Sequence, residues 1–281
     1  MISIIICSRK KQLSSEFIKN IEQTIGCNFE FIVIDNSTNK YSIFEAYSIG
    51  IKKSIGNYLC FMHDDIFIHS NNWGVSIDEI YKNDSKIGLI GIAGCKIKSK
   101  MPSAWWDAPK NEHVVHIIQH YKSKPTQKLD IGFKESSCIE VAAIDGVFMV
   151  MKKQNNICFN NKLNGFHNYD LNASFEHIKK GLKIVVTNKI LLEHFSIGQL
   201  DKTWYKSVFK IHQLYSDVLP INKNNFPQES NTLELKNGIN FIYNAFHLKQ
   251  FNIAFKSWVK FFFVYPFSIY HFKLIKKIVL K

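Results

Sequence analysis

The sequence has little that would cross-link it or anchor it in a membrane. Its six cysteines include no Cys-x-x-Cys pair, so we expect a reducing compartment and no structural zinc. No run reaches the roughly 18 apolar residues of a membrane span. The apolar run at residues 2–7 lacks the preceding basic segment of a secretory signal and reads as a first strand. There is also no internal repeat. We therefore expect a cytoplasmic protein.

Acidic residues are scarce, above all towards the C-terminus. The 36 Lys and Arg residues exceed the 23 Asp and Glu residues, giving a formal net charge of +13, and residues 236–281 contain eight lysines and no acidic residue. Such a charge suggests an anionic partner such as a nucleotide, a lipid surface or nucleic acid. Residues 251–281 are also rich in aromatics. They predict either a helix that binds an anionic membrane at the inner face or a helix packed on the domain with a solvated lysine face.

Strand and helix patterns alternate through the first half of the chain. The continuous apolar runs favour buried strands, and the helical patterns between them have one apolar face. This alternation predicts a parallel sheet covered by helices. The expected strands are residues 2–7, 30–35, 58–62 and 87–93, and the expected helices are residues 15–25, 42–54 and 72–82.

The second half of the chain is less regular. Residues 94–137 are long for a connection and predict a functional loop or an inserted hairpin. A strand pair is expected at 139–151, a helix at 171–180, and extended segments at 183–186 and 190–194. We therefore predict an α/β domain with a mixed, Rossmann-like sheet over residues 1–200, and a helical, basic and aromatic extension over residues 201–281.

The most informative motif is an apolar run that ends in charged residues. Tyr58–Met62 is followed directly by His63, Asp64 and Asp65. Residues just beyond a buried strand lie where open α/β sheets bind ligands. Oxygen ligands at such a place suit Mg²⁺ or Mn²⁺, which commonly bridge a protein to a diphosphate. The alternative is a solvated turn in which Asp caps the next segment.

Two more acidic groups follow predicted strands. Asp35 ends the second strand, where its carboxylate would bind the N–H of a base or a ribose hydroxyl, or would form an Asx turn. Asp145 and Gly146 interrupt an apolar extended run. Glycine there allows a ligand or another backbone to approach closely, although a hairpin turn or bulge would explain it equally well.

A third carboxylate stands at the start of a helix. Asp170 precedes the helix expected from Leu171 and is placed to be its N-cap. A carboxylate at a helix N-terminus is also fixed in direction and kept ionised by the helix dipole, which suits a general base that takes a proton from a sugar hydroxyl. Further on, His194 ends a strand and could supply a neutral nitrogen to the metal, or could simply be hydrogen-bonded.

The irregular middle segment contains aromatic and histidine residues. Trp105 and Trp106 could form a platform for a sugar acceptor, because indole faces stack on sugar rings, or they could fill the core. His113, His116 and His120 would share one face of a helix. Their β-branched neighbours favour a strand instead, which would separate them, so we do not expect a zinc site.

In order and spacing, these motifs resemble those of the family 2 glycosyltransferases with the GT-A fold, over about residues 1–200. The resemblance implies an inverting, metal-dependent transfer of a hexosyl group from a nucleotide diphosphate donor to a glycan or glycolipid hydroxyl, as in surface polysaccharide synthesis. It assigns Asp170 as the catalytic base, and it places Mn²⁺ or Mg²⁺ on Asp65 and His194. The nucleotide contacts implied are Cys7, Ser8, Arg9, Asp35 and Asp64, and the sugar-binding residues expected are Asp145, Gly146, Tyr169, Trp105 and Trp106.

Two positions depart from the family pattern. His63 occupies the place of the first carboxylate of the metal motif, and Tyr169 stands where the family usually has Glu. The Tyr169 ring would be placed to stack on an acceptor sugar. The missing carboxylate leaves a second function open, a catalytically degenerate module that binds glycan or nucleic acid. A nucleotidyltransferase is a further alternative, but residues 7–11 have no glycine for a triphosphate loop.

Overall fold

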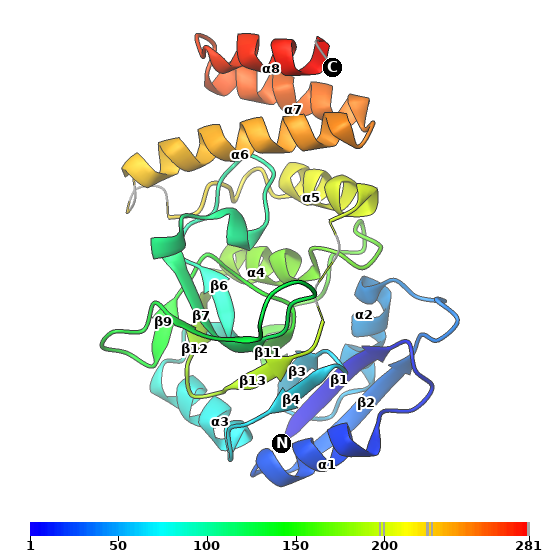
Figure 1. The fold of residues 1–281 in the computed structure, drawn as a ribbon. Coiled ribbons are helices and arrows are strands. Elements are labelled where there is room, and N and C mark those ends of the chain that lie inside the picture. The colour runs from blue at the N-terminus through cyan, green and yellow to red at the C-terminus, as the bar shows by residue number, and fades with distance from the viewer. Residues whose placement is uncertain (197, 199, 223–224, 226, 280–281) are drawn as a thin grey trace.

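The computed structural model describes residues 1–196, 198, 200–222, 225 and 227–279 (Figure 1). The main sheet has seven strands in the order β2-β1-β3-β11-β5-β12-β9. Their bounds are β1 Ile2–Ser8, β2 Phe29–Asp35, β3 Tyr58–Met62, β5 Ile87–Gly91, β9 Cys138–Glu140, β11 Phe148–Lys152 and β12 Lys183–Thr187. The strands predicted in the first half of the chain are therefore confirmed, with shifts of one or two residues at their ends.

The sheet is mixed, as predicted for the GT-A fold. Strands β2, β1 and β3 are parallel, whereas β11 lies antiparallel between β3 and β5. The prediction of a strand pair at residues 139–151 is wrong. Its three strands bond to different partners: β9 to β12, β10 (Ala143–Ile144) to β6, and β11 to β3 and β5. The Asp145-Gly146 step thus lies between strands of two different sheets.

A second, smaller sheet has the order β10-β6-β7-β13-β4, and β8 pairs with β7. Its strands are β4 Ile66–Ile68, β6 Ala93–Cys95, β7 His113–Gln119, β8 Gln127–Ile131 and β13 Leu192–His194. The antiparallel β7–β8 pair is the inserted hairpin expected within residues 94–137. Strand β13 lies between β4 and β7, so His194 comes to lie close to the residues that follow β3.

The helices of the first part are α1 Ser15–Thr24, α2 Ile43–Lys53, α3 Trp73–Asn83 and α4 Tyr169–Lys179. Helix α2 begins with a capping box in which Ser42 and Glu45 bond to each other's backbone N–H groups, a pattern that fixes a helix start. Helix α4 begins two residues earlier than predicted. Its N-cap is Asn168 with a φ of 60°, so the prediction that Asp170 is the N-cap is wrong, and Asp170 lies within the first turn.

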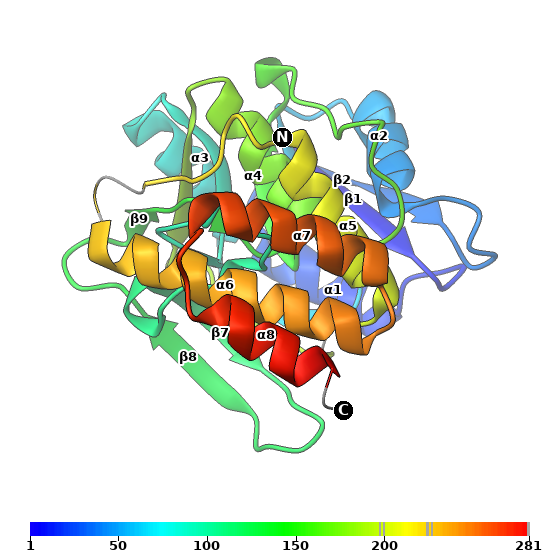
Figure 2. The ribbon, with the colours of Figure 1, turned by 90° about the horizontal axis from the view of Figure 1, so that it is seen from above.

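The C-terminal part is helical, with α5 Lys202–Leu214, α6 Pro227–His247, α7 Phe251–Val264 and α8 Tyr270–Val279. Helix α5 packs into the main core through Ile211, and Tyr215 follows it into that core. Outside α5 lies α6, and α7 and α8 cover α6 at the end of the molecule away from the N-terminus (Figures 1 and 2). Among the described residues, no helix combines the length and apolar character needed to cross a membrane.

Candidate active site

The carboxyl ends of β1 and β2 and the turn after β3 lie together at one edge of the main sheet. Ser8 and Asp35 are register partners on β1 and β2, and the Ser8 hydroxyl donates to Asp64 Oδ2 over 2.5 Å. Asp35 is exposed and accepts the Ser37 N–H at 2.9 Å, which is an Asx turn. The structure thus brings together three of the residues predicted to bind nucleotide.

Two neighbouring residues border the same edge. The Cys7 Sγ accepts a long hydrogen bond of 3.6 Å from Asn36 Nδ2, and burial raises the pKa of the Cys7 thiol, so the group is neutral. The Arg9 guanidinium lies 5.5 Å from the centre of the Phe166 ring. Phe166 also lines a cavity of about 590 Å³ next to this edge. The contact with Phe166 therefore places the positive charge of Arg9 near both the strand edge and the cavity.

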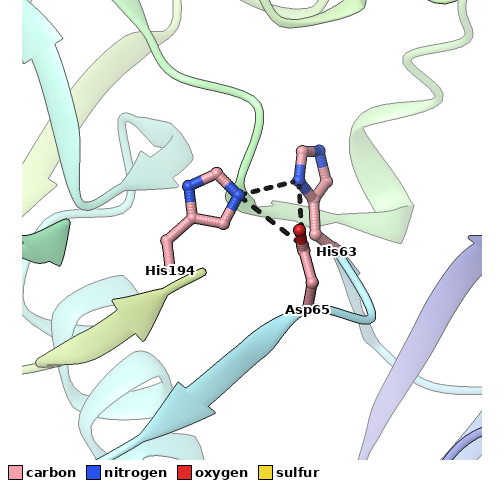
Figure 3. Close-up of side chains that lie close together, drawn as sticks. All are labelled: His63, Asp65 and His194. Atoms are coloured by element: carbon pink, nitrogen blue, oxygen red, sulfur yellow. Dashed lines mark hydrogen bonds and ion pairs between the residues drawn. The ribbon is translucent and has the colours of Figure 1, made fainter. Parts of the chain in front are cut away.

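His63, Asp65 and His194 form a compact cluster (Figure 3). Asp65 Oδ1 lies 3.6 Å from His63 Nδ1 and 3.5 Å from His194 Nε2, and the two nitrogens are 3.4 Å apart. These distances are too long for good hydrogen bonds. Asp65 Oδ1 is buried and accepts no hydrogen bond, although buried carboxylate oxygens normally have a partner. Three ligand-type atoms therefore converge on one point.

The charges within this cluster support one another. Burial raises the pKa of Asp65, but the His194 and His63 imidazoles and the Ser196 hydroxyl lower it by more, so its net shift is well below the usual range. For His63, burial lowers the pKa and Asp65 raises it, and the net shift is upward. Asp65 is thus ionised at neutral pH and attracts positive charge.

Each histidine of the cluster is oriented by a hydrogen bond through its other ring nitrogen. His194 Nδ1 lies 3.1 Å from Gln119 Oε1, and the Gln119 amide group donates to the carbonyl of Ser196 at 2.8 Å, which fixes its orientation. His63 Nε2 lies 2.6 Å from Tyr169 Oη. When each of these outer nitrogens donates, His194 Nε2 and His63 Nδ1 carry lone pairs beside Asp65, and Ser196 Oγ lies 3.5 Å from His194 Nε2.

Sequence reasoning missed two members of this arrangement. His63 was predicted only as the replacement of a carboxylate, and Gln119 was not predicted at all. The position of His63 directly after β3, two residues before Asp65, was a signal for it. Nothing in the sequence marks Gln119, because its role depends on β7 pairing with β13 in parallel.

Asp170 and Asp145 are the other two carboxylates of this region. Burial raises the pKa of Asp170 to about 7, and the charge of Asp145 adds to this rise. Asp170 Oδ1 accepts the N–H of Leu171 at 2.8 Å. Asp145 is held by Trp105 Nε1 at 2.9 Å and by the N–H of Val147 at 2.8 Å. Asp170 can therefore gain and lose a proton near neutral pH.

The close neighbour that Gly146 allows is the side chain of Tyr169, whereas the sequence predicted a ligand or another backbone segment there. A Cβ at this position would lie 2.5 Å from the Tyr169 ring, much closer than van der Waals contact. Tyr169 is buried, and its ring also packs edge-on against Tyr47 with centroids 5.5 Å apart. These contacts hold the ring, and its hydroxyl bonds to His63. That the ring stacks on a sugar stays a prediction.

Most of the predicted residues line one cavity of about 590 Å³. Trp105 is buried in its wall, whereas Trp106 is 41% exposed and has its ring 6.3 Å from that of Trp204 on α5. The cavity wall contains the following predicted site residues: Trp105, Trp106, Asp145, Gly146, Tyr169, Asp170 and His194. It also contains His63. The residues predicted to bind nucleotide do not line this cavity. Among them, Ser8 is hydrogen-bonded to Asp64, which directly follows His63 of the cavity wall in the sequence.

His113 and His116 of β7, and His120 directly after it, each bond to a different partner. His113 bonds to the carbonyl of Ala108, His116 to Asp130, and His120 to Glu193. In the part of the chain that the structure describes, the metal-like grouping of His, Cys, Asp and Glu is the His63, Asp65 and His194 cluster.

Comparison with solved structures gives distant similarities. S. aureus TarS 1–349 has 12% sequence identity and a TM-score of 0.54, covering 92% of this chain and 78% of that chain. TarS 1–349 in complex with UDP-GlcNAc has 10% identity and a TM-score of 0.49, covering 88% and 72%. GalNAc-T7 with UDP, GalNAc and Mn²⁺ has 11% identity and a TM-score of 0.49. The match covers 70% of this chain and 43% of that one, so this chain spans less than half of the GalNAc-T7 structure.

A comparison with curated proteins finds no match. Residues 3–217, well over half of the chain, match the family described as a glycosyltransferase-like family. The likeness to TarS with a TM-score above 0.5 shows the fold. The chain therefore belongs to the glycosyltransferase-like family and has the GT-A fold of the family 2 enzymes that its sequence motifs resemble.

Proposed function

We propose that this protein is an inverting glycosyltransferase that moves a hexosyl group from a nucleotide diphosphate donor to a hydroxyl of a glycan or glycolipid. The observation that carries the proposal is the set of residues that line the 590 Å³ cavity. A carboxyl group whose pKa is raised to about 7 shares that cavity with two histidines that converge on an ionised carboxylate. A candidate base and two residues of a candidate cation site thus line the same cavity.

The donor nucleotide would lie along the ends of β1 and β2. Asp35 is exposed there to bind the base or the ribose, and Asp64 is fixed by Ser8 for a ribose hydroxyl. The half-buried Cys7 and the cationic Arg9 complete the proposed nucleotide contacts. From this edge the diphosphate would extend to the cavity. There Asp145, next to Gly146 in the sequence, would accept a hydrogen bond from a hydroxyl of the donor sugar.

The residues at the cation site fit a divalent metal. Asp65 Oδ1 is buried without a hydrogen-bond partner, and two imidazole nitrogens lie within 3.6 Å of it, so a cation would satisfy an otherwise unpaired anion. Imidazole ligands suit Mn²⁺ better than Mg²⁺, which prefers oxygen ligands. We therefore propose Mn²⁺ on His63, Asp65 and His194. When bound, the ion would neutralise charge that develops on the leaving diphosphate.

Asp170 would act as the base of a single displacement. One of its oxygens is occupied by the N–H of Leu171, which leaves the other to accept the proton of the acceptor hydroxyl. As that proton moves to Asp170, the acceptor oxygen forms a bond to the anomeric carbon. The bond from that carbon to the diphosphate breaks on the opposite face, and its electron pair leaves with the diphosphate. The configuration at the anomeric carbon is thereby inverted.

The acceptor would approach along the tryptophan side of the cavity. Trp106 is partly exposed beside Trp204, and an exposed indole face is a suitable platform for a sugar ring. Trp105 would instead position Asp145 through its indole N–H. We propose a cytoplasmic enzyme of surface polysaccharide synthesis, as the family resemblance implies.

The pH dependence of transfer follows from the raised pKa of Asp170. Because the base must be ionised, we expect the rate to rise about tenfold per pH unit below pH 7 and to level off above it. The measurement is the rate of transfer between pH 5 and 9 at saturating donor. Donor affinity measured over the same range is the control. A rate that is flat from pH 5 to 9 would remove Asp170 as the base.

Replacing Tyr169 by Phe tests how His63 is oriented. Loss of the hydroxyl removes the 2.6 Å hydrogen bond to His63 Nε2, so we expect Mn²⁺ to bind about tenfold more weakly. Tyr121→Phe is the matched control, because Tyr121 also lines the cavity and has no contact with the cluster among those described. Titration of Mn²⁺ measures both variants. Equal affinity in the two would show that Tyr169 does not position His63.

A thermal-shift panel tests the proposed function as a whole. The panel contains UDP, GDP, CMP and their common sugar conjugates, each with and without Mn²⁺. A ligand at 100 times its dissociation constant stabilises a protein by about 2.7 kcal/mol, which raises the melting temperature by several degrees. We expect one diphosphate to do so only with Mn²⁺. If none does, the chain is better described as a degenerate module that binds glycan or nucleic acid.

A further inference from the structure

The outer layer of the molecule carries an unusual number of exposed apolar side chains. Of the seventeen large hydrophobic residues that are exposed among those described, ten lie between positions 251 and 275. Phe263 is 79% exposed, Phe267 100% and Phe272 75%. The full set, here called the α7–α8 face, is Phe251, Phe255, Val259, Phe262, Phe263, Val264, Phe267, Ile269, Phe272 and Ile275.

This face is not the side by which the two helices pack on the protein. The packing contacts of α7 are made by the buried Ala254, Ser257 and Phe261, and those of α8 by the buried His271 and Leu274. Phe261 and Leu274 join Met101 and Ile242 in a small core with α6. The inner sides of both helices are thus already filled. Two aromatic rings of the face also have contacts within the protein, Phe251 with Phe246 of α6 and Phe262 with His271 of α8. Phe263, Phe267 and Phe272 are the most exposed aromatics of the face, and both helices lie at one end of the molecule (Figure 1).

The positive charge around the α7–α8 face indicates which kind of partner it would bind. Lys256, Lys273 and Lys276 are exposed on the same two helices, and no acidic residue occurs after Glu234. Two copies of this face would bring lysines together with no carboxylate to pair with them. Exposed aromatics and lysines on the same two helices match an anionic lipid surface, in which rings enter the boundary region and ammonium groups contact phosphates.

The face also continues into a hollow between α5 and α7. The hollow measures about 360 Å³, and its wall includes Phe209 of α5 together with Phe255 and Val259 of the α7–α8 face. Lys256 and Lys260 lie at the same hollow. An apolar wall beside cationic groups has the character of a lipid contact, with acyl carbon against the rings and phosphate near the lysines.

We propose that the α7–α8 face is a peripheral binding surface for bilayers that contain anionic phospholipid. The helices lie on the surface and do not span it, since none of those described has the length and apolar character of a membrane span. This inference is independent of the catalytic proposal, because none of the ten residues of the face lines the 590 Å³ cavity.

Vesicle flotation of the full chain tests the proposal. We expect the protein to float with vesicles of phosphatidylcholine and phosphatidylglycerol and to stay unbound with phosphatidylcholine alone. The double variant Phe263→Ser/Phe267→Ser should bind at least tenfold more weakly. Its matched control, Ile55→Ser/Val75→Ser, removes two exposed apolar residues of the sheet domain and should bind like the wild type.

A charge variant gives a second test. Lys273→Gln/Lys276→Gln should weaken binding to the anionic vesicles, and Lys52→Gln/Lys53→Gln on α2 should not. Equal flotation of the wild type and the aromatic variant would overturn the proposal. The proposal would also be overturned if the wild type formed a dimer in solution, the aromatic variant were a monomer, and the wild type did not bind vesicles. The face would then bind a second copy of the chain. Neither result would affect the nucleotide thermal-shift panel.

Discussion

Asp170→Asn should lower the rate of sugar transfer by about 10²- to 10⁴-fold, the usual contribution of a general base. The amide cannot accept the proton of the acceptor hydroxyl, yet it has nearly the shape of the carboxyl group and can still accept the N–H of Leu171. We therefore expect the affinities for nucleotide and Mn²⁺ to remain close to those of the wild type. Single-turnover transfer and thermal shift measure the two properties separately.

The stability of this variant separates a lost base from a lost fold. The pKa of Asp170 rises from 3.8 to about 7 in the folded protein, so its contribution to stability is full below pH 3.8 and is lost as pH rises to about 7. Because Asn carries no charge, Asp170→Asn should be at least as stable as the wild type at pH 8. Asp217→Asn, an exposed residue paired with Lys179 of α4, is the control for activity. A transfer rate of Asp170→Asn near that of wild type would assign the base elsewhere.

The second large effect is expected at the proposed cation site. Asp65→Ala removes the one carboxylate between His63 and His194 and leaves two imidazoles without the anion that attracts the ion. Loss of residues that merely orient metal ligands costs about 10- to 100-fold in metal affinity, so loss of a ligand should cost at least about 100-fold. Binding of Mn²⁺, followed by its electron paramagnetic resonance signal, measures this directly.

A matched pair elsewhere in the protein controls for this substitution. Asp130 lies 3.2 Å from His116, so Asp130→Ala also breaks a contact between aspartate and histidine, but away from the cluster. We expect Asp130→Ala to bind Mn²⁺ like the wild type. If Asp65→Ala binds Mn²⁺ as tightly as the wild type does, the three residues do not form a metal site.

The sequence alone was enough to predict much of the fold, because strands buried on both faces are continuous apolar runs. The run at Ile2–Ser8 and the motif that follows Tyr58–Met62 place their polar residues at one sheet edge by geometry alone. The pairing of residues 138–152 could not be predicted in the same way. Their three strands bond to residues 45 to 94 positions away in sequence, which no local pattern specifies.

The candidate site shows the same division. Asp65 follows β3, Asp170 lies in the first turn of α4 and His194 ends β13, so each could be recognised from its position near the end of an element. The contacts that orient them depend on tertiary packing. Tyr169 reaches His63 only because Gly146 has no side chain, and Asn168 starts α4 through a left-handed backbone. The sequence alone consequently did not reveal the bond between Tyr169 and His63.

The most direct test of the central claim is release of nucleoside diphosphate from sugar nucleotides by the purified chain. A panel of UDP- and GDP-sugars would be incubated with Mn²⁺, with and without acceptor glycans, and the diphosphate product would be quantified. We expect one donor to be consumed, with the rate lost in both Asp170→Asn and Asp65→Ala. Turnover that is the same in wild type and in both variants, or no turnover of any donor that binds, would contradict the proposed function.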